Sequence, residues 1–197
     1  GFSYSWQNLD YRNNPRRGSQ VRLKAALGNK RIGRNTSIEA LGLAYLYDSL
    51  QTQALQGKVE LSLAHHFPLF QQSTLRLAGS GGLLFSQAAV YANEQFRLGG
   101  NQLLRGFDEE FFFARYFAVS TLEYRLLIDT NSFLFAFWDS AYLQDTQSIQ
   151  YPFGFGAGIS LETSSGIFSL SMAYGKSPQT PLDLSSPKVH FGYLSLF

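Results

Sequence analysis

An arginine flanked by a glycine, Arg105, is the residue in this chain whose chemistry is most constrained by its neighbours. It lies in a turn-forming segment whose candidate functional residues are Arg97, Gly99, Gly100, Leu104, Arg105, Gly106 and Phe107. A guanidinium group does not lose its proton and presents a rigid set of N–H donors. If this segment folds into the interior of a protein, Arg105 must therefore find carboxylate partners there.

Two carboxylates in later segments are the candidate partners. Glu123 alternates with Leu122 and Tyr124, and Asp139 follows Trp138. Because successive side chains of a strand point to opposite faces, each acid lies on the face away from its large apolar neighbours. If the apolar face meets lipid, a charge there is penalised by about 2 to 4 kcal/mol for a midplane Arg or Lys and less for an acid, so both acids should point inward. An ordinary salt-bridge network without a mechanical role is the alternative.

Other arrangements that could do chemistry are not apparent in the sequence. His65 and His66 are adjacent on a predicted strand and so point to opposite faces, and His190 is distant in sequence, so no metal site is expected. The absence of cysteine excludes a disulfide framework and thiolate metal sites. No serine or acid falls into a recognisable nucleophile and base arrangement. We therefore expect a protein that is not an enzyme and needs no cofactor.

The composition favours strands in contact with a membrane. Aromatic residues make up 16% of the 197 residues, with 18 Phe and 11 Tyr, and such residues are abundant where strands meet lipid headgroups. No run approaches the roughly 20 apolar residues of a spanning helix, so membrane insertion would require a closed barrel. The formal net charge of +2 is too small to indicate nucleic acid as a partner.

Alternation of apolar with small or polar residues predicts an all-β, antiparallel fold. Periodicity alone is compatible with either a soluble sandwich, whose apolar face is a core, or a transmembrane barrel, whose apolar face meets lipid. Gly154, Gly156 and Gly158 share one face of a strand, which indicates either a backbone that approaches closely or simple curvature. About nine strands are predicted: residues 2–12, 18–29, 57–67, 73–86, 117–128, 132–143, 152–163, 166–175 and 188–197.

Turn signals divide the connections between these strands into two sets. Short turns rich in Gly, Pro, Asn, Asp, Ser and Gln occur at 13–18, 68–72, 129–132 and 163–166. Longer connections at about 30–56, 87–116, 144–151 and 176–187 fall on the opposite side, as in outer-membrane barrels, whose periplasmic turns are the short ones. Segment 38–48 is assigned to a structured outer loop. If it were a tenth strand, the first turn, at 13–18, would lie on the side of the long connections instead of the side of the short turns.

The segment around Arg105 resembles the loop signature of the BamA/TamA superfamily of outer-membrane assembly and secretion barrels. Leu104, Arg105, Gly106 and Phe107 match the (Val/Leu)-Arg-Gly-(Phe/Tyr) tip of that loop. The resemblance implies that residues of about 87–116 fold back into the barrel lumen. It also implies that the arginine pairs with Asp139, in the strand motif Phe137-Trp138-Asp139, and often with Glu123.

The end of the chain resembles the terminal strand by which outer-membrane barrels are recognised during assembly. Gly192 and the final Phe197 match that pattern, whereas Ser195 stands where an apolar residue is usual. The family barrel has about sixteen strands. Residues 1–197 are therefore expected to be one unit, the C-terminal part of such a barrel, which nine strands cannot close in the same way.

The resemblance implies a function in the bacterial outer membrane. The expected activity is insertion or assembly of other outer-membrane proteins; the alternatives are a two-partner-secretion type of polypeptide transporter and a barrel that anchors a larger protein. The expected partners are outer-membrane lipid, unfolded client proteins, and accessory lipoproteins or periplasmic POTRA domains. Nucleic acid is not among them.

Overall fold

The computed structural model describes residues 1–33, 40–43, 45, 53–145 and 148–195, and these form an almost entirely antiparallel β structure. Short elements lie between the long strands: η2 (Ala92–Glu94), β5 (Phe96–Leu98), α2 (Gly100–Leu103), β6 (Phe112–Ala114) and β9 (Ile149–Gln150). The long strands in the described residues are β1 (Phe2–Leu9), β2 (Gly18–Arg31), β3 (Gln53–Phe70), β4 (Ser73–Ser86), β7 (Tyr116–Leu127), β8 (Phe133–Gln144), β10 (Phe153–Thr163), β11 (Gly166–Lys176) and β12 (Lys188–Ser195).

The predicted all-β, antiparallel fold class is confirmed, and each of the nine predicted strands has a counterpart among the long strands. The bounds differ most at β3, which begins at Gln53 rather than at 57 and continues to Phe70, while β1 already ends at Leu9. Most of segment 38–48, predicted as an outer loop, lies outside the described residues. No helix in the described parts of the chain is long and apolar enough to span a membrane.

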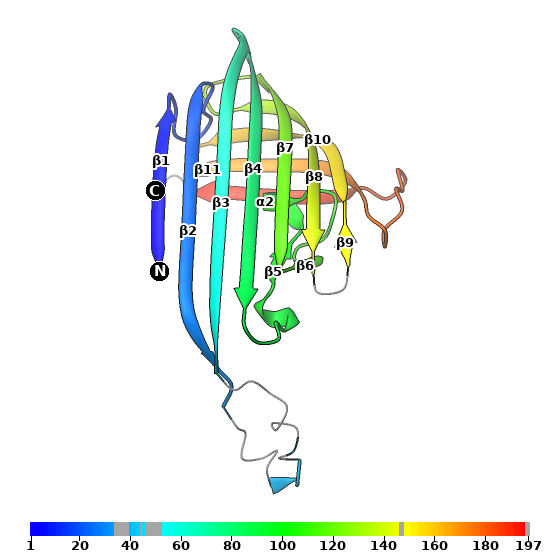
Figure 1. Cartoon of the computed structure of the whole chain (residues 1–197). Helices are drawn as coiled ribbons and strands as arrows, with labels where there is room; N and C mark the ends of the chain where they lie inside the picture. The colour runs from blue at the N-terminus through cyan, green and yellow to red at the C-terminus, as the bar shows by residue number, and fades with distance from the viewer. Residues whose placement is uncertain (34–39, 44, 46–52, 146–147, 196–197) are drawn as a thin grey trace.

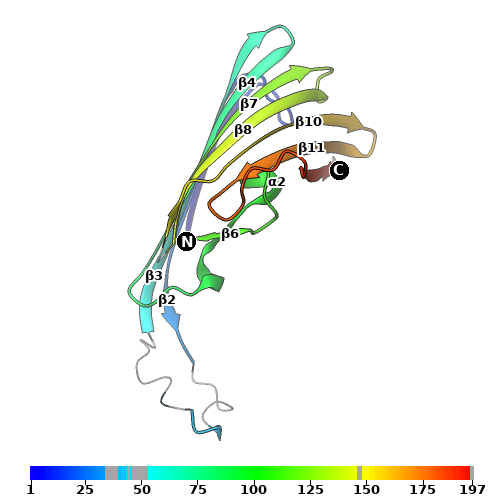
Figure 2. The same cartoon turned by 90° about the vertical axis from the view of Figure 1, so that its right-hand side faces the viewer.

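The long strands form a single sheet in which each is paired with its neighbours in sequence. The order is β1-β2-β3-β4-β7-β8-β10-β11-β12, and β9 pairs with β8 outside this path. The sheet curls into a trough, with the residues between β4 and β7 on its concave side (Figures 1 and 2). It does not close within the described chain, so β1 and β12 are its two edge strands. This shape is that of a curved barrel wall.

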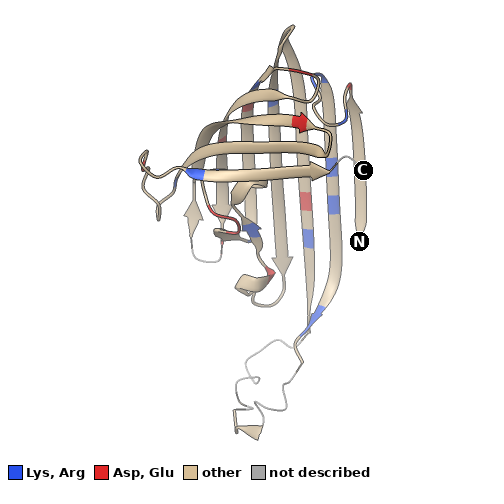
Figure 3. Ribbon diagram, turned by 180° about the vertical axis from the view of Figure 1, so that it is seen from behind, with Lys and Arg blue, Asp and Glu red and all other residues tan. Residues whose placement is uncertain are grey.

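The two faces of the wall differ in chemistry as the alternation predicts. Large apolar side chains cover the convex face; for example, Trp6, Leu61 and Trp138 are 45%, 39% and 46% exposed. Residues of the opposite phase, on the concave face, include buried Glu123 and Asp139 and, on β2 and β3, Arg22, Lys24 and Glu60. Figure 3 marks the charged positions along the strands. An apolar exterior with a polar interior is the arrangement of a transmembrane barrel and the inverse of a soluble sandwich.

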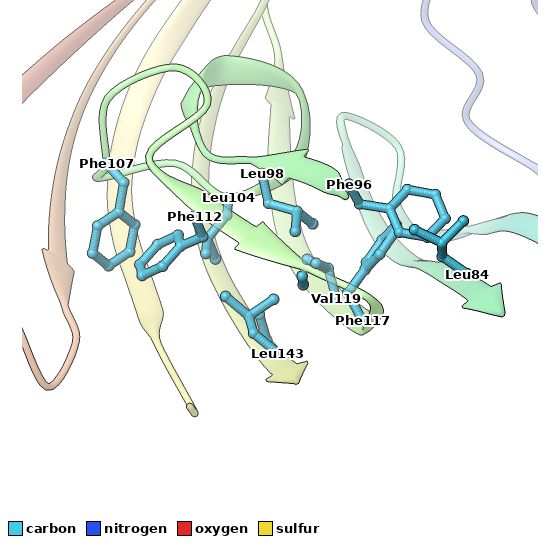
Figure 4. Close-up of a cluster of buried hydrophobic side chains, with 11 residues drawn as sticks. Leu84, Phe96, Leu98, Leu104, Phe107, Phe112, Phe117, Val119 and Leu143 are labelled. Atoms are coloured by element: carbon cyan, nitrogen blue, oxygen red, sulfur yellow. The ribbon is translucent and has the colours of Figure 1, made fainter. Parts of the chain in front are cut away.

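Residues 87–115, which we call the inner loop, pack against the concave face through an apolar cluster. Leu98, Leu104 and Phe107 of the inner loop are almost fully buried, and the ring of Phe96 packs edge-on against Phe117 of β7 at 4.9 Å. Burial of this apolar surface contributes to the attachment of the inner loop to the wall, in addition to the polar contacts of its tip. The cluster consists of Leu84, Phe96, Leu98, Leu104, Phe107, Phe112, Ala114, Phe117, Val119, Ala141 and Leu143 (Figure 4).

Candidate functional site

The tip of the inner loop is a compact turn that presents Arg105 to the wall. Gly100 forms a bridge with Leu104, and the Gly100 amide donates to the carbonyl of Phe107 at 3.2 Å. Gly106 has φ 94°, and a Cβ there would lie 2.7 Å from the backbone of Tyr174 on β11. A side chain at this position would therefore be strained and would push the tip off the sheet.

Arg105 is bound by two carboxylates from adjacent strands. Its Nε and Nη2 donate to the two oxygens of Asp139 on β8, each at 2.8 Å, and its backbone amide donates to Asp139 Oδ2 at 3.2 Å. Its Nη1 donates to Glu123 Oε2 on β7 at 2.7 Å. The three side chains are 10%, 1% and 6% exposed for Arg105, Asp139 and Glu123. The pairing is thus bidentate to one acid and single to the other, a geometry suited to a guanidinium and not to an ammonium.

The wall around Arg105 is shaped to admit it. The guanidinium carbon lies 3.4 Å from the centre of the Phe137 ring, which stands two residues before Asp139 on β8. On the other side, a Cβ at Gly154 would overlap the carbonyl oxygen of Arg105. At Gly156, a Cβ would overlap the carbonyl oxygen of Met172 on β11 and would also lie 2.9 Å from Cζ of the Phe137 ring. The glycine face of β10 therefore serves two purposes: close approach of the inner loop at Gly154 and room for an aromatic ring further along.

Both acids have further partners on the wall. Thr121 Oγ1 donates to Asp139 Oδ1 at 2.8 Å, and Arg125 Nε donates to Glu123 Oε1 at 2.9 Å. Arg76 of β4 lies directly opposite Glu123 in the sheet register. Thr121 and Arg125 supply the two acids, which are held away from bulk water, with hydrogen bonds besides those of Arg105, as a buried ion pair requires. Neither Thr121 nor Arg125 was predicted from the sequence as a partner of the two acids, although both are in phase with Glu123 on β7.

The inner loop also contacts the last strand, β12. The Gly106 amide donates to Nε2 of His190 at 3.0 Å, so that nitrogen carries no proton in this arrangement. Nearby, Lys188 Nζ lies 2.8 Å from Asp108 Oδ1. His190 was not predicted to be a site residue. The only sequence feature that could have identified it is its spacing of two residues from Gly192, which places both on the same face of β12. The tip of the inner loop is thus bonded to β7, β8 and β12.

The remaining predicted residues have different surroundings. Arg97 is exposed and pairs with Glu110 of the same loop instead of reaching the wall. Gly99 precedes α2 with φ 127°, and Gly192 faces the concave side, where a Cβ would lie 3.0 Å from Asn101 Nδ2. Phe197 lies outside the described residues.

A polar-lined barrel wall with an arginine loop bonded to its inner face defines the class to which this protein belongs. The model of the Omp85 superfamily domain matches residues 1–193. The chain therefore belongs to the Omp85 superfamily, whose members are outer-membrane barrels of the assembly and secretion type. Comparison with curated protein sequences gives no match.

Proposed function

We propose that this chain forms part of an outer-membrane barrel that inserts or assembles other membrane proteins without covalent catalysis. The single observation that supports this most directly is the set of four hydrogen bonds from Arg105 to Asp139 and Glu123. They hold the inner loop against the wall, while the apolar convex face is left to meet the bilayer. The proposed location is the bacterial outer membrane.

The proposed mechanism uses the backbone of an edge strand. Among the described residues β12 pairs only with β11, which leaves one row of its N–H and C=O groups without a strand partner. In a bilayer such groups must be satisfied by another strand, so an edge can template an incoming client strand. Because the tip of the inner loop is bonded to β12 through His190, the position of the loop and that of the edge are linked.

The partners of this activity are proposed from its chemistry. The convex face would contact outer-membrane lipid, and the edge would accept unfolded outer-membrane or secreted client proteins. Accessory lipoproteins or periplasmic POTRA domains would deliver those clients from the short-turn side.

Reconstitution of the full-length protein tests the proposal. Arg105→Ala removes the three side-chain hydrogen bonds that the inner loop donates to the two acids and should abolish insertion of a client barrel into liposomes. Arg97→Ala, which removes an exposed arginine of the same loop, is the matched control and should retain insertion. Full insertion activity in Arg105→Ala, with the inner loop still protected from protease, would contradict the proposal.

One observation favours secretion as a second candidate. Arg22 and Lys24 are exposed on the concave face of β2, and no hydrogen bond or ion pair joins them to the inner loop in the described structure. A charged, water-facing strip of this kind suits passage of an unfolded polypeptide along the lumen. Measured translocation of a secreted client, with no insertion of barrel clients, would select this alternative. A barrel that only anchors a larger protein would show neither insertion of barrel clients nor translocation of a secreted client.

A further inference from the structure

The turn between β1 and β2 carries unpaired positive charge. This first turn, residues 10–17, contains Arg12, Arg16 and Arg17, and none of them forms an ion pair with any described residue. Arg12 and Arg17 are exposed, and Arg16 lies over the ring of Tyr11 at 5.5 Å. The turn therefore presents the exposed guanidinium groups of Arg12 and Arg17 to a partner, and the half-buried Arg16, whose Nε is covered, adds a third positive charge beside them.

The only acid of the first turn is used to shape it. Asp10 Oδ1 accepts hydrogen bonds from the backbone amides of Tyr11 at 2.9 Å, Arg16 at 2.9 Å and Arg17 at 3.1 Å. These bonds bring the two ends of the turn together and order the backbone at Arg16 and Arg17. A surface that is already ordered loses little conformational entropy when it binds a partner.

A second anchor fixes the direction in which the first turn points. Asn14 is 1% exposed; its Nδ2 donates to the carbonyl of Thr130, and its Oδ1 accepts from Arg125 Nη1 at 3.0 Å. Thr130 belongs to the β7–β8 connection, and Arg125 faces the concave side. The first turn is consequently drawn over the concave side of the trough and away from the apolar convex face.

We propose that the first turn is a docking surface for an acidic polypeptide segment at the short-turn end of the trough. Guanidinium groups bind carboxylates through paired N–H donors, as the exposed Arg12 and Arg17 can, and the three arginines, none of which has an ion-pair partner among the described residues, provide the complementary charge. The inward direction set by Asn14 separates the arginines from the face that meets lipid, which favours a polypeptide over anionic headgroups. The proposal is independent of whether the barrel assembles or secretes its clients.

The same anchor connects the docking surface to the inner loop. Arg125 is shared between Asn14 Oδ1 and Glu123 Oε1, and Glu123 in turn accepts from Arg105. A segment that holds the first turn in its anchored conformation also holds Arg125 on Glu123. Coupling between the two sites is reciprocal. Docking should therefore increase the protection of the inner loop from protease, and Asn14→Ala should remove that increase.

Peptide binding to the full-length protein in detergent tests the proposal. The probe is a labelled peptide of alternating Glu and Gly, and its Gln counterpart is the uncharged control. Arg12→Gln with Arg17→Gln should raise the Kd by about tenfold or more, and salt of about 0.5 M should weaken binding similarly. Arg31→Gln with Arg97→Gln removes the same charge elsewhere and should leave the Kd within about twofold.

Three outcomes would overturn the proposal. The first is an absence of salt-sensitive binding of the Glu peptide. The second is equal weakening by both pairs of substitutions, which would indicate only a response to net charge. The third is displacement of the peptide by phosphatidylglycerol doped into the micelles, provided that the lipid binds more tightly than the peptide and that its binding depends on the arginines of the first turn. The turn would then be a site for lipid headgroups.

Discussion

Asp139 accepts three hydrogen bonds from Arg105, two from the guanidinium at 2.8 Å and one from the backbone amide at 3.2 Å. The acid thus orients both the side chain and the main chain of the loop tip. A network that orients both parts specifies a single position of the inner loop, which a point charge would not. This relationship, and the two-faced wall that supports it, determine how substitutions in the inner loop and in the sheet should act.

Replacement of Arg105 by Lys should release the tip even though the charge is kept. A lysine ammonium cannot reproduce the fork that reaches both oxygens of Asp139 and also Glu123. We expect the inner loop to be cleaved at least about tenfold faster by a protease, since a loss of about 1.4 kcal/mol corresponds to that factor. Limited proteolysis of the folded protein provides the measurement. Cleavage at the unchanged rate would mean that charge alone positions the tip.

Substitution of Gly154 by Ala should displace the inner loop from β10. The added Cβ would overlap the carbonyl oxygen of Arg105, and overpacking of this kind costs about 1–3 kcal/mol. Gly28→Ala is the control, because a Cβ there meets nothing within 4 Å. The comparison uses urea unfolding of both variants in detergent. Equal midpoints for the two would show that the loop does not approach this glycine.

The two faces of β3 should respond differently to a new charge. Leu61 is on the convex face, and Leu61→Arg should destabilise the barrel in a bilayer by about 2–4 kcal/mol if it lies near the midplane. The adjacent Ser62 is on the concave face opposite Arg22, where Ser62→Arg should cost under about 1 kcal/mol. Folding into lipid vesicles against urea measures both. A larger loss for Ser62→Arg would reverse the assignment of the faces.

The first turn should loosen in acid. Burial alone would raise the pKa of Asp10, but the backbone amides of Arg17, Arg16 and Tyr11 donate to its carboxylate and hold the pKa below its ordinary value. The stabilisation is therefore present above the ordinary pKa of about 4 and is lost as the pH falls through the lower folded value.

Amide hydrogen exchange at Arg16 and Arg17 reports this change. Protection, corrected for the intrinsic pH dependence of exchange, should fall below about pH 4 in the natural protein. In Asp10→Asn it should be weaker and show no such step. A step of the same size in both proteins would assign the titration to another group.

The wall was predictable from sequence because its signals are local. Alternation reaches across a few residues, and Gly, Pro and Asn mark the turns, so the strands and the faces of Glu123 and Asp139 could be read directly. The β3 bounds were less accurate, because residues such as Gln53 are paired through the neighbouring strand and carry no strand pattern of their own.

The contacts that complete the site were not predictable in this way. Asn14 bonds to Arg125 across 111 positions, and Gly106 bonds to His190 across 84. Asn14 looks like an ordinary turn residue, and His190 looks like one inward position among many. Such pairs depend on the curvature of the whole sheet, which a period-two pattern does not specify. Only the three-dimensional arrangement identifies them.

A double-mutant cycle between Arg105 and Asp139 tests the central claim most directly. Unfolding free energies of Arg105→Met, Asp139→Asn and the double variant give the coupling between the two side chains. Each single change should cost about 3–5 kcal/mol, because it leaves a buried charge without its partner, and the double variant should cost clearly less than their sum, by about 1.5 kcal/mol or more. Additive costs within about 0.5 kcal/mol would show that the two residues do not hold the inner loop together.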